Sequence, residues 1–240
     1  MEARLATLLD VEQRMVFYDQ PSPSDGETAG LLAGSVPILI SAPHSTQHLR
    51  TQAWKQEEEY TAALGYLLHQ ETGAHLIYGR YMLDPDPHDD DDAGPYKRFL
   101  ADLLRRNSIR MVIDLHGARG DRDFAVALGT MRGESFSPHE PRMTKIFQRQ
   151  GFTFEPESSL DRLVVNPPRY TGGLHLPTIT RFVWQKHHIP AVQIELSAWV
   201  RIVQRLPNAT NARNQTAPHF RGDGARILRV IEALREFIVG

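Results

Sequence analysis

The sequence of 240 residues contains no cysteine. This absence excludes a disulfide framework, a thiolate nucleophile and a metal site with cysteine ligands. The chain also lacks any apolar run near ~20 residues, so it predicts no membrane span, in keeping with a mean hydropathy of −0.39. Any catalytic chemistry therefore depends on His, Asp, Glu, Ser or Arg side chains.

The chain also has no large excess of positive or negative charge. The chain has 27 basic and 29 acidic side chains and a formal net charge of −2, which gives no reason to expect nucleic acid as a partner. The first residues carry acids at Glu2, Asp10 and Glu12 and no apolar stretch with a small-residue cleavage site, so no secretory signal is predicted. We expect a cytoplasmic globular protein with a single domain over residues 1–240, in which residues 1–33 are peripheral.

Short apolar runs alternate along the chain with segments of helical periodicity. The runs predict strands at 37–42, 74–78, 109–115, 123–129, 161–166 and 191–196. The periodicity predicts helices at 1–15, 57–72, 95–107, 141–150, 176–188 and 224–239. This alternation predicts an α/β domain with a mainly parallel, covered sheet, in which functional groups gather at the carboxyl ends of the strands.

Three polar residues lie at or near the ends of predicted strands. His44 and His116 each follow a strand, and Glu195 stands between Ile194 and Leu196 near the end of another. A carboxylate in a buried strand is destabilising unless another group binds it. Because parallel strands end at one edge of a sheet, these three side chains are expected to form a polar site there.

Imidazole nitrogens and carboxylate oxygens are the ligands that zinc accepts when cysteine is absent. His44 and His116 are far apart in the sequence, so they share an ion only if the fold brings them together. A third ligand is expected from the acidic residues 57–59, and Asp114 either bonds to a turn or orients an imidazole. The alternative is that the histidines are hydrogen-bonded loop residues and that residues 57–59 only open a helix, where the dipole favours negative charge.

Four arginines lie in or beside the loops expected at this edge, and guanidinium groups bind carboxylates in a bidentate manner. As a set they predict an acidic substrate, whereas any one alone is more often a surface residue. These arginines are Arg50, Arg80, Arg119 and Arg169. The acidic run HDDDD at 88–92 lacks the ligand spacing of a calcium loop and is predicted to be a solvated loop.

Five segments occur in the order ISAPHS (40–45), KQEEEYTAAL (55–64), MVIDLHGARGDRDFAVALGT (111–130), VVNPPRYTGG (164–173) and PAVQIEL (190–196). In this order they resemble the N-formylglutamate amidohydrolase family, within the zinc-carboxypeptidase-like hydrolases. The resemblance implies a single-domain, phosphorylase/hydrolase-like α/β fold, with a mixed, mainly parallel sheet and helices on both faces. It implies that zinc is bound by His44, His116 and one acid of residues 57–59, with Glu58 preferred and Glu59 next.

The resemblance also implies that Glu195 is the general base, which activates a water molecule and protonates the leaving amine. The expected activity is cleavage of an amide bond in a small acidic N-acyl amino acid such as N-formylglutamate, with Arg119, Arg169 and Arg80 binding the substrate. The segment GRYMLDPDP (79–87) lacks the Asn-Arg pair that the family has there. The alternatives are a metallo-carboxypeptidase-like peptidase that acts on short peptides and a non-catalytic protein that binds an acidic ligand.

Overall fold

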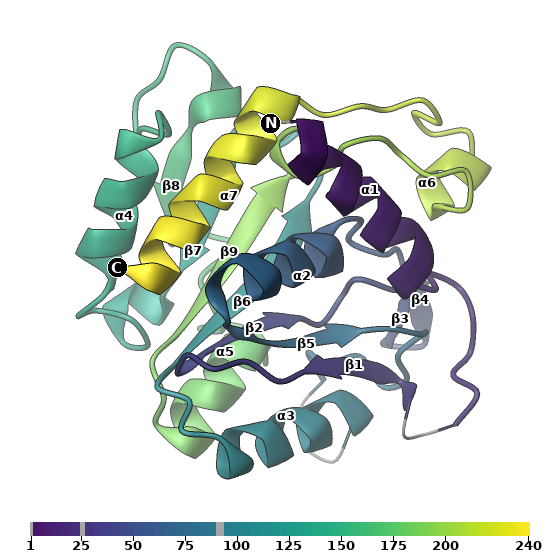
Figure 1. Cartoon of the computed structure of the whole chain (residues 1–240), viewed down its shortest axis with the longest axis horizontal. Coiled ribbons are helices and arrows are strands. Elements are labelled where there is room, and N and C mark those ends of the chain that lie inside the picture. Colours follow the sequence, from purple (N-terminus) through teal and green to yellow (C-terminus); the bar gives the residue numbers. More distant parts are fainter. Residues whose placement is uncertain (1, 25–26, 90–93) are drawn as a thin grey trace.

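A computed structural model describes residues 2–24, 27–89 and 94–240 of the chain. Within these residues a seven-stranded sheet has the order β1-β5-β2-β6-β9-β7-β8 (Figure 1). Its strands are β1 (Ala29–Leu32), β2 (Ile38–Ala42), β5 (His75–Gly79), β6 (Met111–Ala118), β7 (Val126–Gly129), β8 (Leu163–Val165) and β9 (Ala191–Ser197). The pairs β5–β2, β2–β6, β6–β9 and β7–β8 are parallel, and the pairs β1–β5 and β7–β9 are antiparallel. The expected α/β fold with a mixed, mainly parallel sheet is confirmed.

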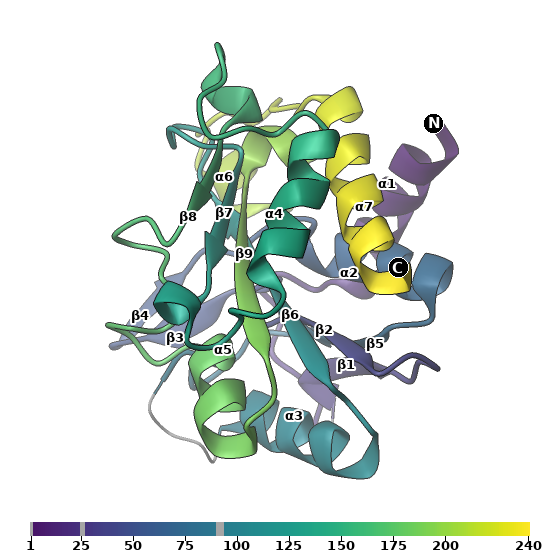
Figure 2. The same ribbon diagram turned by 90° about the vertical axis from the view of Figure 1, so that its left-hand side faces the viewer.

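Helices cover both faces of the sheet (Figures 1 and 2). One face carries α1 (Glu2–Met15), α2 (Thr61–Thr72), α4 (Glu140–Arg149) and α7 (Gly224–Val239). The other carries α3 (Pro95–Arg106) and α5 (Ile179–Phe182), which continues as a π-helix over Val183–His187. The shorter elements are α6 (Thr210–Arg213), the 3₁₀ turns Met131–Gly133, Ser159–Asp161 and Ala198–Val200, and the hairpin β3 (His48–Arg50)–β4 (Ala53–Lys55).

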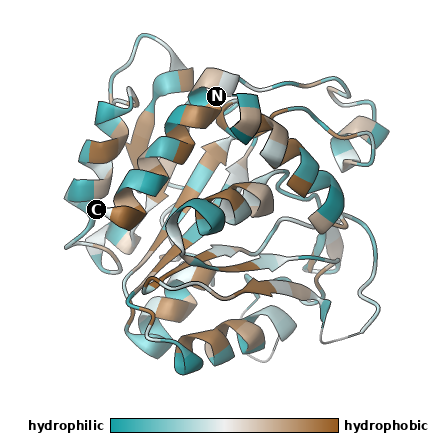
Figure 3. Cartoon of the chain, viewed as in Figure 1, coloured by the Kyte–Doolittle hydropathy of each residue, from teal (hydrophilic) through white to brown (hydrophobic). Residues whose placement is uncertain are grey.

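The strands carry the most apolar stretches of the chain, seen as brown ribbons between the helices in Figure 3. Successive strand residues point to opposite faces, as the pleat of a strand requires. In β2, Ile40 and Ala42 pack in the core under α1, α2, α4 and α7, whereas Leu39 packs in the core under α3 and α5. Of the helices the structure describes, none combines the length and apolar character needed to cross a membrane.

The predicted helix at 57–72 begins four residues later than expected, at Thr61. Tyr60 precedes it in the left-handed region, with φ of 66°, so the three glutamates lie in the loop before the helix and not in its first turn. The C-terminal end is as predicted, because Gly73 closes the helix in the left-handed conformation that glycine adopts without strain. The shift at the start leaves the glutamate side chains free to make tertiary contacts.

The N-terminal helix is part of the core, although residues 1–33 were expected to be peripheral. Leu8 and Val11 pack in the same core as α2 and α7, and the carboxyl group of Glu12 is fully buried. Glu12 Oε1 accepts hydrogen bonds from the Tyr18 hydroxyl and the Tyr60 backbone N–H, each at 2.6 Å. Helix α1 therefore helps to hold the loop that carries the three glutamates.

The buried Glu12 carboxyl predicts a specific dependence of stability on pH. Burial raises its pKa from 4.5 to about 7, so between these values the unfolded chain releases a proton that the folded chain keeps. The stabilisation is complete below pH 4.5 and is lost as the pH rises through 7, by about 3 kcal/mol at about 1.4 kcal/mol per pH unit. We expect the difference in free energy of unfolding, wild type minus Glu12→Gln, to fall by this amount in urea titrations over that range.

The control is Glu2→Gln, which changes an exposed residue on the same helix. A difference between wild type and Glu12→Gln that stays constant with pH, or that grows as the pH rises, would contradict the assignment.

Candidate active site

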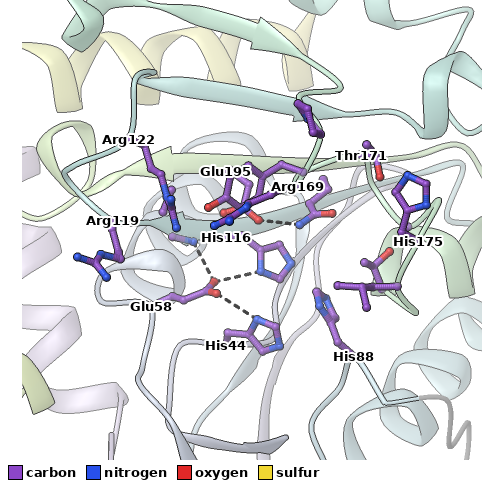
Figure 4. Close-up of a pocket in the computed structure, with 18 of the residues that line it drawn as sticks. His44, Glu58, His88, His116, Arg119, Arg122, Arg169, Thr171, His175 and Glu195 are labelled. Atoms are coloured by element: carbon purple, nitrogen blue, oxygen red, sulfur yellow. Dashed lines mark hydrogen bonds and ion pairs between the residues drawn. The ribbon is translucent and has the colours of Figure 1, made fainter.

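Four polar residues from separate segments line one cavity of about 510 Å³ at the carboxyl edge of the central strands (Figure 4). His44 follows the end of β2, and Glu58 lies in the loop before α2. His116 and Glu195 stand opposite each other on the neighbouring parallel strands β6 and β9. His116 thus lies within its strand and not after it, because β6 continues to Ala118 by pairing with β9.

The Glu58 carboxylate lies between the two imidazoles. Its Oε1 is 3.2 Å from His44 Nδ1, and its Oε2 is 3.0 Å from His116 Nδ1. The backbone N–H of Gly117 donates to Oε2 at 2.9 Å. One carboxylate and two Nδ1 atoms therefore converge from three separate parts of the chain.

The other two glutamates of this run have different partners. Glu57 accepts hydrogen bonds from the backbone N–H and the hydroxyl of Thr210, at 2.5 and 2.6 Å. Glu59 forms a buried ion pair with Arg205 at 2.9 Å. Of the three acids that the sequence left open, Glu58 is the one that reaches His44 and His116.

Each imidazole has a second carboxylate on its far side. His44 Nε2 lies 2.9 Å from Asp86 Oδ1, and His116 Nε2 lies 3.1 Å from Asp114 Oδ2. Both aspartate side chains are fully buried, and Asp114 also accepts a hydrogen bond from Ser41 Oγ at 3.0 Å. A carboxylate behind a histidine that leaves the other ring nitrogen free is the arrangement that orients metal-binding imidazoles.

The charges in this cluster shift the pKa values of its members. Burial alone would lower the pKa of His116, but Asp114 and Glu58 hold it well above 6.5. In the same way Glu58 and Asp86 outweigh burial and raise the pKa of His44. Burial would raise the pKa of Glu58, but the charges of His116 and His44 hold it well below 4.5. Without a cation, the neighbouring carboxylates thus favour the protonated form of the His44 and His116 imidazoles.

Glu195 lines the same cavity but is only 5% exposed. Gln193, two residues earlier on the same strand, donates to Glu195 Oε1 at 2.7 Å. Burial raises the pKa of Glu195 to about 7, with Glu58 adding to the rise and the positive charge of His116 opposing it. A carboxylate with a pKa near the operating pH is suited to accept and return a proton.

Two of the three predicted substrate arginines reach the cavity. Arg119 and Arg169 line it, and the guanidinium of Arg119 pairs with Asp121 at 2.8 Å while staying 77% exposed. Arg80 is not among the described residues that line the cavity. Its guanidinium lies against the rings of Phe17 and Tyr81, 5.8 and 5.5 Å from their centroids, because the segment after α1 runs beside the end of β5. We therefore leave Arg80 out of the site.

The sequence analysis did not select several residues that surround the centre. Asp86 precedes the acidic run at 88–92 and His88 begins it, and this run was predicted to be a solvated loop, yet both residues are part of this cluster. The ring centroid of His88 lies 4.3 Å from that of His44 and 4.8 Å from that of His116. Residues 90–92 of the acidic run lie outside the described residues. Arg122 also lines the cavity, and no periodic or motif signal distinguished it from its neighbours.

The donors present fit a transition-metal ion such as zinc, which accepts imidazole nitrogen and carboxylate oxygen. Over the described part of the chain, two groups of three bring donor atoms within 4.8 Å of one another, namely His44–His88–His116 and His44–His48–Asp86. The buried Nε2 atom of His88 makes no hydrogen bond with any described residue, whereas that of His116 faces the Asp114 carboxylate at 3.1 Å. Both the donor types and the unsatisfied nitrogen of His88 are consistent with a bound cation.

The fold and the cavity define a single mixed α/β domain with a polar site at the carboxyl edge of its parallel strands. In three dimensions the chain is similar to the N-formylglutamate amidohydrolase from Ralstonia eutropha JMP134, with a TM-score of 0.57 and 13% sequence identity over 88% of this chain and 96% of that chain. This similarity establishes the fold.

Two further solved structures are similar to a smaller degree. A bacteriophage poly-gamma-glutamate hydrolase gives a TM-score of 0.48 at 14% identity, over 87% of this chain and 86% of that one. A metallo-carboxypeptidase from Pseudomonas aeruginosa gives a TM-score of 0.45 at 12% identity, over 98% of this chain and 68% of that one. No family model and no curated protein matches the sequence.

Proposed function

We propose that the chain is a zinc-dependent hydrolase that cleaves the amide bond of a small acidic N-acyl amino acid, with N-formylglutamate as the representative substrate. The observation that carries this proposal is the Glu58 carboxylate between two Nδ1 atoms, with a buried aspartate behind each ring. His44, Glu58 and His116 would hold the metal ion. The similarity in fold to an N-formylglutamate amidohydrolase supports the reaction class by analogy.

When bound, Zn²⁺ polarises the amide carbonyl and lowers the pKa of a water molecule. Glu195 then acts as the general base, because its carboxylate faces the cavity beside His116 and its pKa of about 7 allows it to take a proton from water and return it to the leaving amine. Arg119 and Arg169 supply positive charge at the cavity wall for an acidic substrate. Asp114 and Asp86 keep the two imidazoles oriented.

The test is the metal content of the purified protein, measured by elemental analysis beside a His44→Ala/His116→Ala double variant. We expect about one zinc per chain in the wild type and none in the double variant, followed by release of the amino acid from N-acyl amino acids by the loaded wild type. A wild type that takes up no metal after incubation with zinc and washing would refute the proposal and would favour the non-catalytic ligand-binding protein.

Substitution of Asp114, the aspartate behind His116, is expected to weaken zinc binding without abolishing it. Asp114→Asn keeps the size of the side chain but removes the negative charge next to His116 Nε2. That charge orients the imidazole and favours a proton on Nε2, which leaves Nδ1 for the metal. We expect zinc affinity to fall by about 10–100-fold, the usual effect of losing such a partner. Competition with a chromophoric chelator measures it, with Asp121→Asn, on the exposed loop, as the control. Unchanged affinity in Asp114→Asn would contradict the orienting role.

A second candidate is a peptidase with the same metal centre that acts on short peptides. A cavity of about 860 Å³ adjoins the first one and shares Glu58, Gly117 and Arg119 with it. A hollow on this side leaves room for a substrate that extends past the metal centre. The ratio kcat/KM should increase from N-acyl amino acids to di- and tripeptides if this candidate is correct, and should decrease if the N-acyl amino acid is the substrate.

A further inference from the structure

We propose that His88 is a fourth protein ligand of the metal ion that His44, Glu58 and His116 hold. The inference rests on the proposed function, since it concerns the same metal centre. It adds a ligand from the loop before α3, a part of the chain in which neither the sequence pattern nor the five family-like segments placed a metal ligand.

The position of His88 in the centre is the first observation. Donor atoms of His44, His88 and His116 lie within 4.8 Å of one another. Figure 4 shows the His88 ring beside those of His44 and His116 and facing into the cavity. Its ring is set at 67° to that of His44 and at 48° to that of His116. The three rings are thus inclined to one another, and it is the closeness of their donor atoms that allows them to share one ion.

The unsatisfied nitrogen of His88 is the second observation. His88 Nε2 is buried and makes no hydrogen bond within the described ranges, and a buried polar atom without a partner is destabilising. A metal ion at the centre of the cluster would satisfy this nitrogen. By contrast, the Nε2 atom of His44 already lies 2.9 Å from a carboxylate oxygen of Asp86.

The backbone of His88 is tied to the same carboxylate. Its N–H donates to Asp86 Oδ1 at 2.7 Å, the oxygen that also faces His44 Nε2. Asp86 further pairs with Arg50. One buried aspartate therefore positions His44 through its ring and His88 through its main chain, so the two imidazoles approach the centre together.

The rival group of His44, His48 and Asp86 is less suited to hold the ion. Asp86 is already engaged by His44, by Arg50 and by the main chain of His88. His48 Nδ1 is bonded to the Thr46 carbonyl at 3.1 Å, and its ring stacks on that of His44 with centroids 4.0 Å apart. The donors of this group are thus used in holding the first group in place.

Three neutral imidazoles and one carboxylate would leave a net charge of +1 on a bound Zn²⁺. With four protein ligands, a water molecule or substrate would reach the ion only as a fifth ligand. The added imidazole is expected to increase the affinity for metal and to enclose the ion on the side of the α3 loop.

The experiment compares wild type with His88→Ala and His88→Gln, and uses His219→Ala as a control with the same number of histidines as His88→Ala. His219 is exposed and does not line the cavity of the metal centre. Two properties are measured: the Zn²⁺ dissociation constant by chelator competition, and the visible absorption of the Co²⁺ protein, which reports the number and type of ligands. Circular dichroism verifies that each variant is folded.

We expect both His88 variants to bind Zn²⁺ at least ~10-fold more weakly, since even an outer partner of a ligand contributes that much. We also expect their Co²⁺ spectra to change in intensity and position, while His219→Ala matches the wild type. Unchanged affinity and spectrum in the His88 variants would overturn the assignment. Weaker binding with an unchanged Co²⁺ spectrum would also overturn it, because His88 would then act only through packing.

These outcomes separate the inference from the proposal on which it rests. If His44→Ala/His116→Ala loses the metal and both His88 variants bind it as tightly as the wild type, His88 is not a ligand but the proposed function stands. If the wild type itself binds no metal, both fail.

Discussion

Glu195→Gln is expected to lower kcat by at least about 10²-fold while the protein keeps its metal. Glutamine has the shape of glutamate but cannot take a proton from water, and general bases contribute about 10²–10⁴-fold to rate. Metal binding should persist because the Glu58 carboxylate, and not Glu195, lies between His44 and His116. Steady-state kinetics on an N-acyl amino acid and elemental analysis of the same sample measure the two effects.

The control for this substitution is Glu195→Asp, which keeps a carboxylate at the same place on β9. It should retain more activity than Glu195→Gln, since only the reach of the base has changed. If Glu195→Gln retains more than about a tenth of the wild-type kcat, another group carries the proton and the assignment of the base is wrong.

The second large effect is expected at Glu58. Glu58→Gln replaces the shared carboxylate with a neutral amide and removes the negative charge between the two imidazoles. Zinc affinity should fall by more than ~10²-fold, beyond the loss seen when only an outer partner is removed. Equilibrium dialysis against zinc buffers measures this directly, and activity should fall in parallel.

The chain provides a matched control in the adjacent residue. Glu57→Gln makes the same chemical change one position earlier, but Glu57 is bonded to Thr210 and does not reach either histidine. It should bind zinc as the wild type does. Loss of zinc in Glu57→Gln with retention in Glu58→Gln would reverse the assignment of the third ligand.

Metal binding to this centre should also release protons. In the absence of a cation, the neighbouring carboxylates raise the pKa values of His116 and His44, and a ring nitrogen must lose its proton before it binds a metal. Apparent zinc affinity should therefore fall as the pH is lowered. Calorimetry in buffers with different ionisation enthalpies measures the protons released, and a heat that is independent of the buffer would contradict the assignment.

The strands and helices that the sequence predicted correctly are those with long, regular patterns. The apolar run at 109–115 and the amphipathic pattern at 224–239 became β6 and α7, because buried strands and helices are built from such periodicities. The edge strand β1 and the hairpin β3–β4 were not predicted. Each of these three strands has only one or two large apolar residues, and β4 is exposed throughout, so none carries a hydrophobic pattern strong enough to detect.

The residues of the candidate site likewise differ in whether a sequence pattern marks them. His44, His116 and Glu195 could be selected because each stands near the end of an apolar strand, where a polar side chain is unusual. Asp86 and His88 could not be selected, since they lie in a segment without periodicity whose composition is typical of a solvated loop. Asp86 contacts His44 and Arg50, and His88 lies against the rings of His44 and His116, and no local pattern encodes these contacts.

By itself the sequence determined the α/β class, the approximate positions of the main strands and helices, and the residue types available for chemistry. Only the tertiary structure decided which acid of the 57–59 run reaches the two imidazoles and that Arg80 does not face the cavity. The reason is that side-chain direction depends on distant partners. Glu57 is held by Thr210 and Glu59 by Arg205, 153 and 146 residues away, and these contacts leave Glu58 to face His44 and His116.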